Sequence, residues 1–266
     1  MAMADPHELL ELAIDVVEKA GRLAAEGQAK VDVLDTKSSP TDVVTEMDRA
    51  TEDLIRTRLL TARPSDALLG EEGGAARGTT GVRWIVDPID GTVNYLYGRP
   101  DWAVSIAAEA DGEIVAGAVA APVHGETYTA TRGGGARCDG VELRAGEAVP
   151  LEMALVATGF GYEAQRRSQQ AEVLRAVLPR VRDIRRCGSA ALDLCSLAKG
   201  RANAYYERGL NQWDWAAAAL VAAEAGVHVA GLHGRAPNSD LTVAAVPGLF
   251  EELHDLLAAL GADADG

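Results

Sequence analysis

The chain has little from which to build a membrane span, a disulfide framework or an aromatic core. Its 266 residues include 3 cysteines, 2 phenylalanines and 4 methionines. No run of roughly 18 or more apolar residues appears, so no membrane-spanning helix is predicted. Residues 1–11 lack a basic region followed by a long apolar run, so no signal peptide is predicted and the cytoplasm is the expected location. The core is expected to rely on alanine and valine.

The few cysteines and histidines show no metal-binding pattern. Cys138, Cys187 and Cys195 form neither a disulfide framework nor a zinc motif, and buried free thiols are expected. None of the 5 histidines lies four residues from another, so all are interpreted as structural or surface residues.

Basic residues are also scarce. The chain has 25 Lys and Arg but 40 Asp and Glu, which gives a net charge of −15. This charge disfavours a protein that grips nucleic-acid backbones, which are polyanions. A small phosphorylated substrate is still compatible with it, provided that carboxylates gathered in a cleft hold divalent cations that attract the anion.

Periodicity predicts an α+β first half, residues 1–145, and an α/β second half, residues 146–266. In the first half, an Asp-Pro start predicts a helix from Asp5 to about Gly27, and a second helix is expected over about 47–60. Turn signals separate β-prone runs at 102–108, 113–121 and 126–131, which predicts an antiparallel meander. In the second half, helices are expected at about 163–178, 190–199, 214–225 and 247–260, with strands at 181–186 and 202–206 between them.

The strongest local motif is Asp87-Pro88-Ile89-Asp90-Gly91-Thr92, after the apolar run Trp84-Ile85-Val86. Proline fixes φ and lacks an N–H, so the chain is predicted to turn at once and to bring both carboxylates towards one point. Gly91 would let the following N–H groups approach an anion. Asp, Pro and Gly are also ordinary turn formers. That explanation leaves two acids beside a buried-looking strand without compensation, so a metal-bridged phosphate site is favoured.

Two further acidic segments are weak signals individually. Gly70-Glu71-Glu72 follows an apolar pair, but acidic glycine-rich loops are common on protein surfaces. Asp214, in Gln212-Trp213-Asp214-Trp215, opens a predicted helix, and a plain N-cap explains it without any metal.

Together these segments resemble the inositol monophosphatase family of Mg²⁺-dependent, lithium-sensitive phosphatases. The resemblance rests on segments in the order of the family, from position 37 to position 226: Lys37-Ser38-Ser39-Pro40-Thr41-Asp42 with Thr45 and Asp48, Gly70-Glu71-Glu72, residues 84–94, Trp213-Asp214 and Glu224-Ala225-Gly226. Tyr95 replaces a common phenylalanine, and Ala217 a frequent glycine. Neither change affects an expected catalytic residue.

The resemblance implies a layered αβαβα sandwich, a homodimer and two or three Mg²⁺ ions per site. One ion would be held by Glu71, Asp87 and the carbonyl of Ile89. A second would be held by Asp87, Asp90 and Asp214, and a weaker third ion would lie near Glu71.

The same resemblance assigns the remaining site residues. Gly91 and Thr92 would donate N–H bonds to the phosphate, and Thr92, supported by Asp48, would help Glu71 to orient the attacking water. The alcohol side of the substrate would be lined by Asp90, Gly188, Ser189, Ala190 and Glu207.

Other functions are weighed against this one. An Asp-x-Asp-Gly-Thr loop is typical of haloacid-dehalogenase-like phosphatases, but here two residues separate the acids, and that family is rejected. The alternative from another class of function is a non-enzymatic protein that binds the transcription or translation machinery.

Among substrates, myo-inositol monophosphate is preferred because Glu207 matches the position that contacts the inositol ring. Fructose 1,6-bisphosphate, histidinol phosphate and 3′-phosphoadenosine 5′-phosphate stay open.

Overall fold

The structure, a computed structural model, describes residues 4–30, 33–36 and 43–264. The segment 37–42, which contributes to the family resemblance and contains a predicted loop at 38–41, lies outside the described residues. In the part that is described, no helix is long and apolar enough to cross a membrane.

The larger sheet has eight strands in the order β10-β9-β8-β7-β6-β5-β3-β4. All neighbours pair antiparallel except β3 and β5, which are parallel. The strands are β3 (Ala67–Gly70), β4 (Gly74–Ala76), β5 (Val82–Asp90), β6 (Ala103–Ala110), β7 (Glu113–Ala121), β8 (Glu126–Thr131), β9 (Gly135–Cys138) and β10 (Val141–Glu142). The predicted antiparallel meander is confirmed by β6, β7 and β8. A separate antiparallel pair, β1 (Val33–Thr36) and β2 (Val43–Thr45), precedes the sheet.

The second half forms a five-stranded mixed sheet in the order β12-β11-β13-β15-β14. The parallel strands are β11 (Leu155–Thr158), β12 (Asp183–Arg185) and β13 (Ala204–Glu207), and β15 (Thr242–Ala245) pairs antiparallel with β13 and with β14 (His228–Ala230). The sequence did not predict β11, a short strand directly after a 3₁₀ turn at 151–153.

Apart from the short α3, for which the sequence predicted no helix range, the helices agree with the predicted ranges to within a few residues. They are α1 (Pro6–Gly27), α2 (Glu46–Ala62), α3 (Thr92–Leu96), α4 (Ala164–Val177), α5 (Ala190–Ala198), α6 (Gln212–Glu224) and α7 (Phe250–Ala259), with 3₁₀ turns at 28–30, 151–153 and 178–180. As the sequence predicted, Asp5 caps α1, because its side chain accepts a hydrogen bond from the His7 N–H at 2.9 Å.

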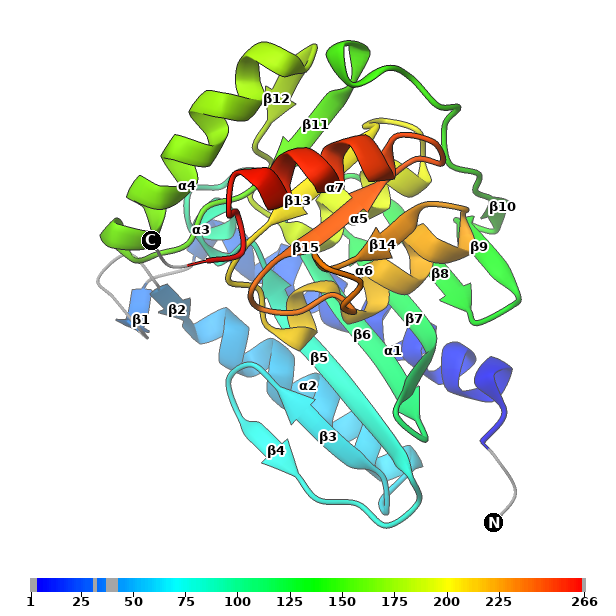
Figure 1. The fold of residues 1–266 in the computed structure, drawn as a ribbon. Helices are drawn as coiled ribbons and strands as arrows, with labels where there is room; N and C mark the ends of the chain where they lie inside the picture. Colours follow the sequence, from blue (N-terminus) through cyan, green and yellow to red (C-terminus); the bar gives the residue numbers. More distant parts are fainter. Residues whose placement is uncertain (1–3, 31–32, 37–42, 265–266) are drawn as a thin grey trace.

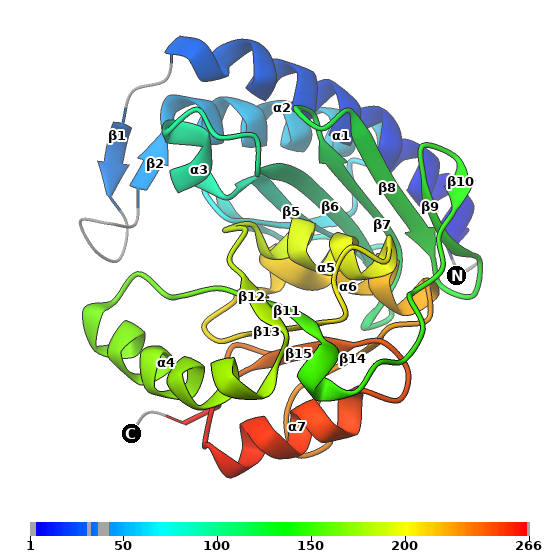
Figure 2. The same cartoon turned by 90° about the horizontal axis from the view of Figure 1, so that it is seen from above.

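Helices and sheets stack in five layers, as Figures 1 and 2 show. Helices α1 and α2 cover one face of the larger sheet, and α5 and α6 lie between the two sheets. Helices α4 and α7 lie on the outer side of the smaller sheet. The predicted αβαβα sandwich is therefore confirmed.

Helix α6 is buried along most of its length because a sheet lies on either side of it. Its alanines allow close packing, and α6 approaches β7 closely at Gly117. A Cβ added to Gly117 would lie 2.9 Å from the Ala217 carbonyl oxygen. The family's frequent glycine at position 217 is absent here, and the glycine on the facing strand provides the room. One core cluster therefore contains side chains from both halves of the chain. The division at residue 145 stays a prediction.

Candidate active site

The end of β5 carries both aspartates of the Asp87–Thr92 motif. The strand does not turn at Pro88 as predicted; it continues to Asp90, with an irregular register against β6 between the two aspartates. The reason is that the proline interrupts the ladder by only one bond at this position, where a bulge accommodates it. The Asp87 carboxylate accepts a hydrogen bond from the Ile89 N–H at 3.0 Å. Both carboxylates are buried at the same strand end.

The turn after β5 depends on Gly91. Its φ of 96° lies in the left-handed region, and a Cβ there would lie 3.0 Å from the Asp101 carbonyl oxygen and 3.1 Å from that of Gly188. Any larger residue would be both strained and crowded. The N–H groups of Gly91 and Thr92 thus begin the short helix α3 beside the two aspartates.

Thr92 is positioned by a hydrogen bond to Asp48 of α2. Its hydroxyl lies 3.0 Å from Asp48 Oδ1 and 3.0 Å from the Ile89 carbonyl oxygen, both of which are acceptors. Asp48 in turn accepts from the Thr45 N–H at 2.7 Å and from the Thr45 hydroxyl at 2.5 Å, which closes the capping box of α2. The structure therefore joins Asp48 to Thr92, although Asp48 lies behind the cavity and does not line it.

The loop that carries Glu71 is fixed by a residue that the sequence did not single out. Glu52 of α2 is buried, and its carboxylate accepts from the N–H groups of Glu72 and Gly73 at 2.7 Å each. A Cβ at Gly70 would collide with this carboxylate. In the sequence Glu52 is simply one acid on a polar helix, and only its burial shows that it positions the loop.

Asp214 approaches from the other half of the chain. Helix α6 begins at Gln212 rather than at Asp214, and Asn211 is its N-cap. Asp214 is therefore not the N-cap; its carboxylate accepts from the Asn211 N–H at 2.6 Å, in the third helical position. This arrangement exposes the side chain to the same cavity that the β5 aspartates line.

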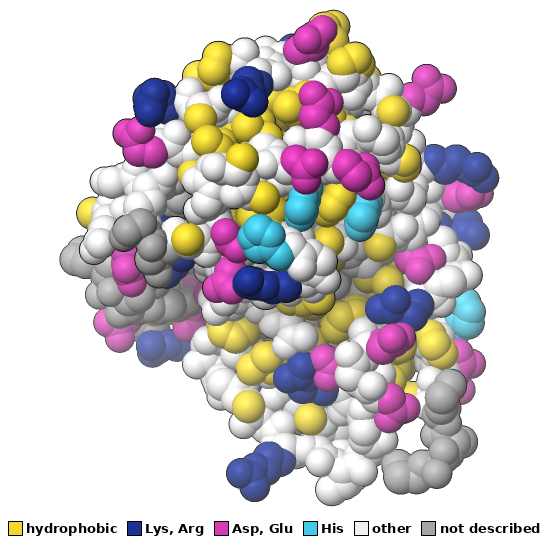
Figure 3. All heavy atoms as spheres, viewed as in Figure 1, with side chains coloured by type: hydrophobic (Ala, Val, Ile, Leu, Met, Phe, Trp, Pro, Cys, Tyr) yellow, Lys and Arg dark blue, Asp and Glu magenta, His cyan; other side chains and the backbone are white. Residues whose placement is uncertain are grey.

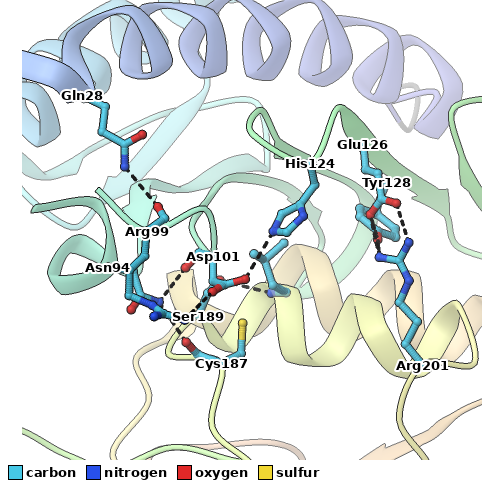
Figure 4. Close-up of polar contacts among 11 residues, drawn as sticks. Gln28, Asn94, Arg99, Asp101, His124, Glu126, Tyr128, Cys187, Ser189 and Arg201 are labelled. Atoms are coloured by element: carbon cyan, nitrogen blue, oxygen red, sulfur yellow. Dashed lines mark hydrogen bonds and ion pairs between the residues drawn. The ribbon is translucent and has the colours of Figure 1, made fainter. Parts of the chain in front are cut away.

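The segment before α5 meets Asp90 directly. Asp90 Oδ2 accepts from the Ser189 hydroxyl at 2.6 Å and from the Ala191 N–H at 2.7 Å. Ser189 thus lies behind Asp90, whereas Gly188 and Ala190 line the cavity. Figure 4 shows how the Asn94 amide holds the two halves together, since it donates to the carbonyl oxygens of Asp101, at 2.7 Å, and Cys187, at 2.9 Å.

Glu207 lies at the end of β13 and lines the same cavity as Asp214. It accepts a hydrogen bond from the Tyr205 hydroxyl at 2.8 Å. Burial, together with the negative charge of Asp90, raises the pKa of Glu207 to about 7 despite this bond.

These side chains surround one cavity of about 370 Å³. Its lining includes all of the expected metal ligands and the arginines Arg166, Arg186 and Arg208, which the sequence did not single out. The predicted residues on its surface are Glu71, Asp87, Ile89, Asp90, Gly91, Thr92, Gly188, Ala190, Glu207 and Asp214.

The cavity concentrates negative charge. Burial raises the pKa of Asp90 to about 6. Burial, and then the charges of Glu71 and Asp90, raise the pKa of Asp214 well above its usual range. Carboxylate and carbonyl oxygens are the ligands that Mg²⁺ prefers, and a cation would offset this repulsion, so the residues present fit a magnesium site.

The carboxylates are not, however, already gathered around one point. Within the described residues, no group of three or more His, Cys, Asp or Glu side chains has the arrangement of a metal site. Oxygens of Asp87, Asp90 and Asp214 are turned towards neighbouring N–H or hydroxyl donors instead.

Known proteins match the chain over most of its length. The inositol monophosphatase family matches residues 5–262. An inositol-1-monophosphatase SuhB of Mycobacterium tuberculosis is 51% identical over 241 residues, which cover 84% of this chain and 80% of that protein. A Nus factor SuhB of Pasteurella multocida is 36% identical, covering 93% of this chain and 94% of that protein. The solved structure of Mycobacterium tuberculosis SuhB superposes with a TM-score of 0.84 and 43% identity, covering 98% of this chain and 99% of that one. The chain therefore belongs to the inositol monophosphatase family.

Proposed function

We propose that the protein is a Mg²⁺-dependent phosphatase that hydrolyses small phosphate monoesters by direct attack of water. The observation that carries the proposal is the single cavity in which Glu71, Asp87, Asp90 and Asp214 face the N–H groups of a left-handed glycine turn. Acids suited to cations beside amides suited to an anion are what a metal-bridged phosphate needs.

Two metal positions are proposed, with a weaker third near Glu71. Glu71, Asp87 and the Ile89 carbonyl would hold the first ion, and Asp87, Asp90 and Asp214 the second. Bound Mg²⁺ would neutralise the phosphate dianion and make water a better nucleophile.

Groups of the protein itself would orient the phosphate and the attacking water. The N–H groups of Gly91 and Thr92 would bind the phosphate oxygens at the start of α3. The single proton of the Thr92 hydroxyl points to Asp48 or to the Ile89 carbonyl, both at 3.0 Å, so a lone pair of the oxygen is left to accept a hydrogen bond from water. Together with Glu71, Thr92 would hold that water for attack.

The alcohol side of the cavity suggests the substrate class. Glu207 lies at its wall beside Gly188 and Ala190, where it can accept hydrogen bonds from hydroxyl groups. We propose myo-inositol monophosphate, in keeping with the name of the mycobacterial relative. Fructose 1,6-bisphosphate, histidinol phosphate and 3′-phosphoadenosine 5′-phosphate are the alternatives.

A homodimer is also proposed, and light scattering that gives the mass of a monomer at micromolar concentration would contradict it.

The second candidate function is binding to the transcription or translation machinery. It is favoured by relatives that carry the name Nus factor SuhB and are 36–38% identical to this chain. The net charge of −15 makes a protein partner more suitable than RNA itself.

Turnover separates the two functions. Phosphate release is measured with the four candidate substrates in the presence of Mg²⁺ and again after addition of EDTA. A phosphatase releases phosphate from at least one of them only with the metal, whereas a binding protein releases none.

During turnover, acid quenching and borohydride treatment should trap no phosphoprotein, and label on Asp87 or Asp90 would contradict direct attack of water.

A further inference from the structure

Arg166 is a cation that the proposed mechanism leaves unused. It lies in the first turn of α4 and lines the candidate active-site cavity together with Arg186 and Arg208. As Figure 2 shows, the start of α4 and the short helix α3 lie towards the same side of the molecule, one in each half of the fold. Thr92 of α3 and Arg166 of α4 line the same cavity.

The backbone around Arg166 is shaped to receive its side chain. A Cβ at Gly161 would lie 2.9 Å from Arg166 Cδ, and a Cβ at Gly209 would lie 2.7 Å from Arg166 Nη1. Both glycines line the cavity, and Gly209 has a φ of 89°. A side chain at either position would push the guanidinium away, so the two glycines define where it lies.

The other two cavity arginines interact with other groups of the protein. Arg186 lies close enough to Asp90 and Glu207 for its charge to lower the pKa of both. Arg208 is buried and donates from Nη1 to the Ala264 carbonyl oxygen at 2.8 Å.

Arg166 has no such partner within the described part of the chain. It forms no ion pair there, and its Nε is buried without a hydrogen-bond acceptor. A buried donor without an acceptor is costly, and a guanidinium binds phosphate or carboxylate oxygens through two parallel bonds. A group of that kind on the substrate would satisfy it.

We propose that Arg166 forms a second anion subsite, which favours phosphate monoesters that carry another anionic group, such as a second phosphate, away from the bond that is cleaved. The inference rests on the proposed phosphatase function and adds a substrate preference to it. The carboxylates at β3, β5 and α6 serve the phosphate that reacts, whereas Arg166 comes from the α4 side of the cavity. A cavity of about 370 Å³ is within the size range of small-molecule sites, roughly 300–1,000 Å³.

The test compares Arg166→Gln with Arg175→Gln in the full-length protein with Mg²⁺. Arg175 lies on the same helix but outside this cavity, in an exposed pair with Glu172, so it controls for loss of charge on α4. The substrates are fructose 1,6-bisphosphate, inositol 1-phosphate and 4-nitrophenyl phosphate, of which only the first carries a second phosphate.

For Arg166→Gln we expect kcat/KM to fall at least about tenfold with the bisphosphate, mainly through KM, and less than about threefold with the two monophosphates. Arg166→Lys should recover part of the loss, because it keeps the charge without the paired geometry. Arg175→Gln should leave all three substrates unchanged. An equal loss on all three substrates, or no loss on the bisphosphate, would overturn the subsite.

Calorimetric titration with fructose 1,6-bisphosphate provides a readout that does not need turnover. The wild-type protein should bind it at least about tenfold more tightly than Arg166→Gln does. Should the wild type bind but release no phosphate from any substrate, the proposed function fails while the subsite stands. Equal affinities of the two proteins would instead disprove the subsite, whatever the activity.

Discussion

At the scale of single residues, the cavity holds its acids in an environment that opposes their charge. Burial comes first among the causes that raise the pKa of Asp90, Glu207 and Asp214. An acid whose pKa is raised on folding destabilises the folded state once it ionises, because burial removes water from the charged form. The carboxylates therefore reduce stability at neutral pH in the absence of a cation.

Asp214→Asn should separate the chemical role of this acid from its structural one. Asparagine keeps an oxygen that can accept the Asn211 N–H but removes one charge from the cavity. We expect phosphate release to fall by more than about 100-fold. In EDTA the melting temperature should stay unchanged or rise by about 2–4 °C, since repulsion with Glu71 and Asp90 is relieved. Full Mg²⁺-dependent turnover by this variant would remove Asp214 from the metal site.

Glu207→Gln tests the alcohol side of the site. Glutamine can still accept the Tyr205 hydroxyl, so the local fold is retained. Loss of a charged acceptor for ring hydroxyls costs about 1–3 kcal/mol, and KM for inositol 1-phosphate should rise about tenfold or more. Hydrolysis of 4-nitrophenyl phosphate, which has no ring hydroxyls, should scarcely change. Equal effects on both substrates would mean that Glu207 acts on the metal site instead.

At the scale of elements, the site is assembled where strand and helix ends meet. β5 presents two aspartates, α2 supports Thr92 through Asp48 and the Glu71 loop through Glu52, and α6 presents Asp214. Helix α2 thus supports two parts of the site although none of its side chains lines the cavity.

Glu52→Gln should disturb the Glu71 loop without touching a proposed ligand. Its carboxylate accepts two backbone N–H groups and forms an ion pair with Arg56 at 3.2 Å, whereas glutamine is uncharged and has only one oxygen to offer. We expect the Mg²⁺ concentration for half-maximal activity to rise about fivefold, and the free energy of unfolding to fall by about 1–3 kcal/mol. The neighbouring Asp53 is exposed on the same helix, and Asp53→Asn should alter neither quantity. A stability loss with unchanged Mg²⁺ dependence would limit Glu52 to a role in folding.

At the scale of the whole molecule, polar contacts join the larger sheet to the second half of the chain. Glu126 of β8 pairs with Lys199 and Arg201, both just after α5, at 2.6 Å, and Figure 4 shows the pair with Arg201 beside Tyr128. The Arg201 hydrogen bond is the largest of the causes that lower the pKa of Glu126 to about 2. This contact ties the larger sheet to the second half of the chain.

The stability from this pair should depend on pH. Because folding lowers the pKa of Glu126, its contribution is complete above the unfolded value near 4.5 and is lost as pH falls towards 2. Glu126→Gln should therefore lower the free energy of unfolding at pH 7 by about 1–2 kcal/mol, a value reduced for the solvent exposure of Arg201. In urea unfolding, the difference from the wild type should shrink from pH 6 to pH 3. Asp183→Asn, which breaks an exposed pair with Arg185, is the control and should have little effect. A difference that does not depend on pH would contradict this account.

The tertiary structure also gathers side chains that are far apart in the sequence. His228 stacks on Phe250 with ring centroids 3.7 Å apart, and the centroids of His233 and His254 are 6.3 Å apart. Figure 3 shows histidine side chains close together among acidic ones on the face that carries α7. Their expected role as surface or structural residues is unchanged, but they form one group rather than isolated positions.

The sequence by itself determined what depends on neighbours along the chain. The helix periodicity, the Asp5 cap, the meander and the acids of the Asp87–Thr92 motif are local patterns, and their order along the chain indicated the family. Only the tertiary structure decided which distant residues meet. The burial of Glu52 under the Glu71 loop, the continuation of β5 past Pro88 and the position of Arg166 between Gly161 and Gly209 follow from the packing of separate elements. The physical reason is that capping and periodicity act within a few residues, whereas desolvation and ion pairing depend on what the rest of the fold places nearby.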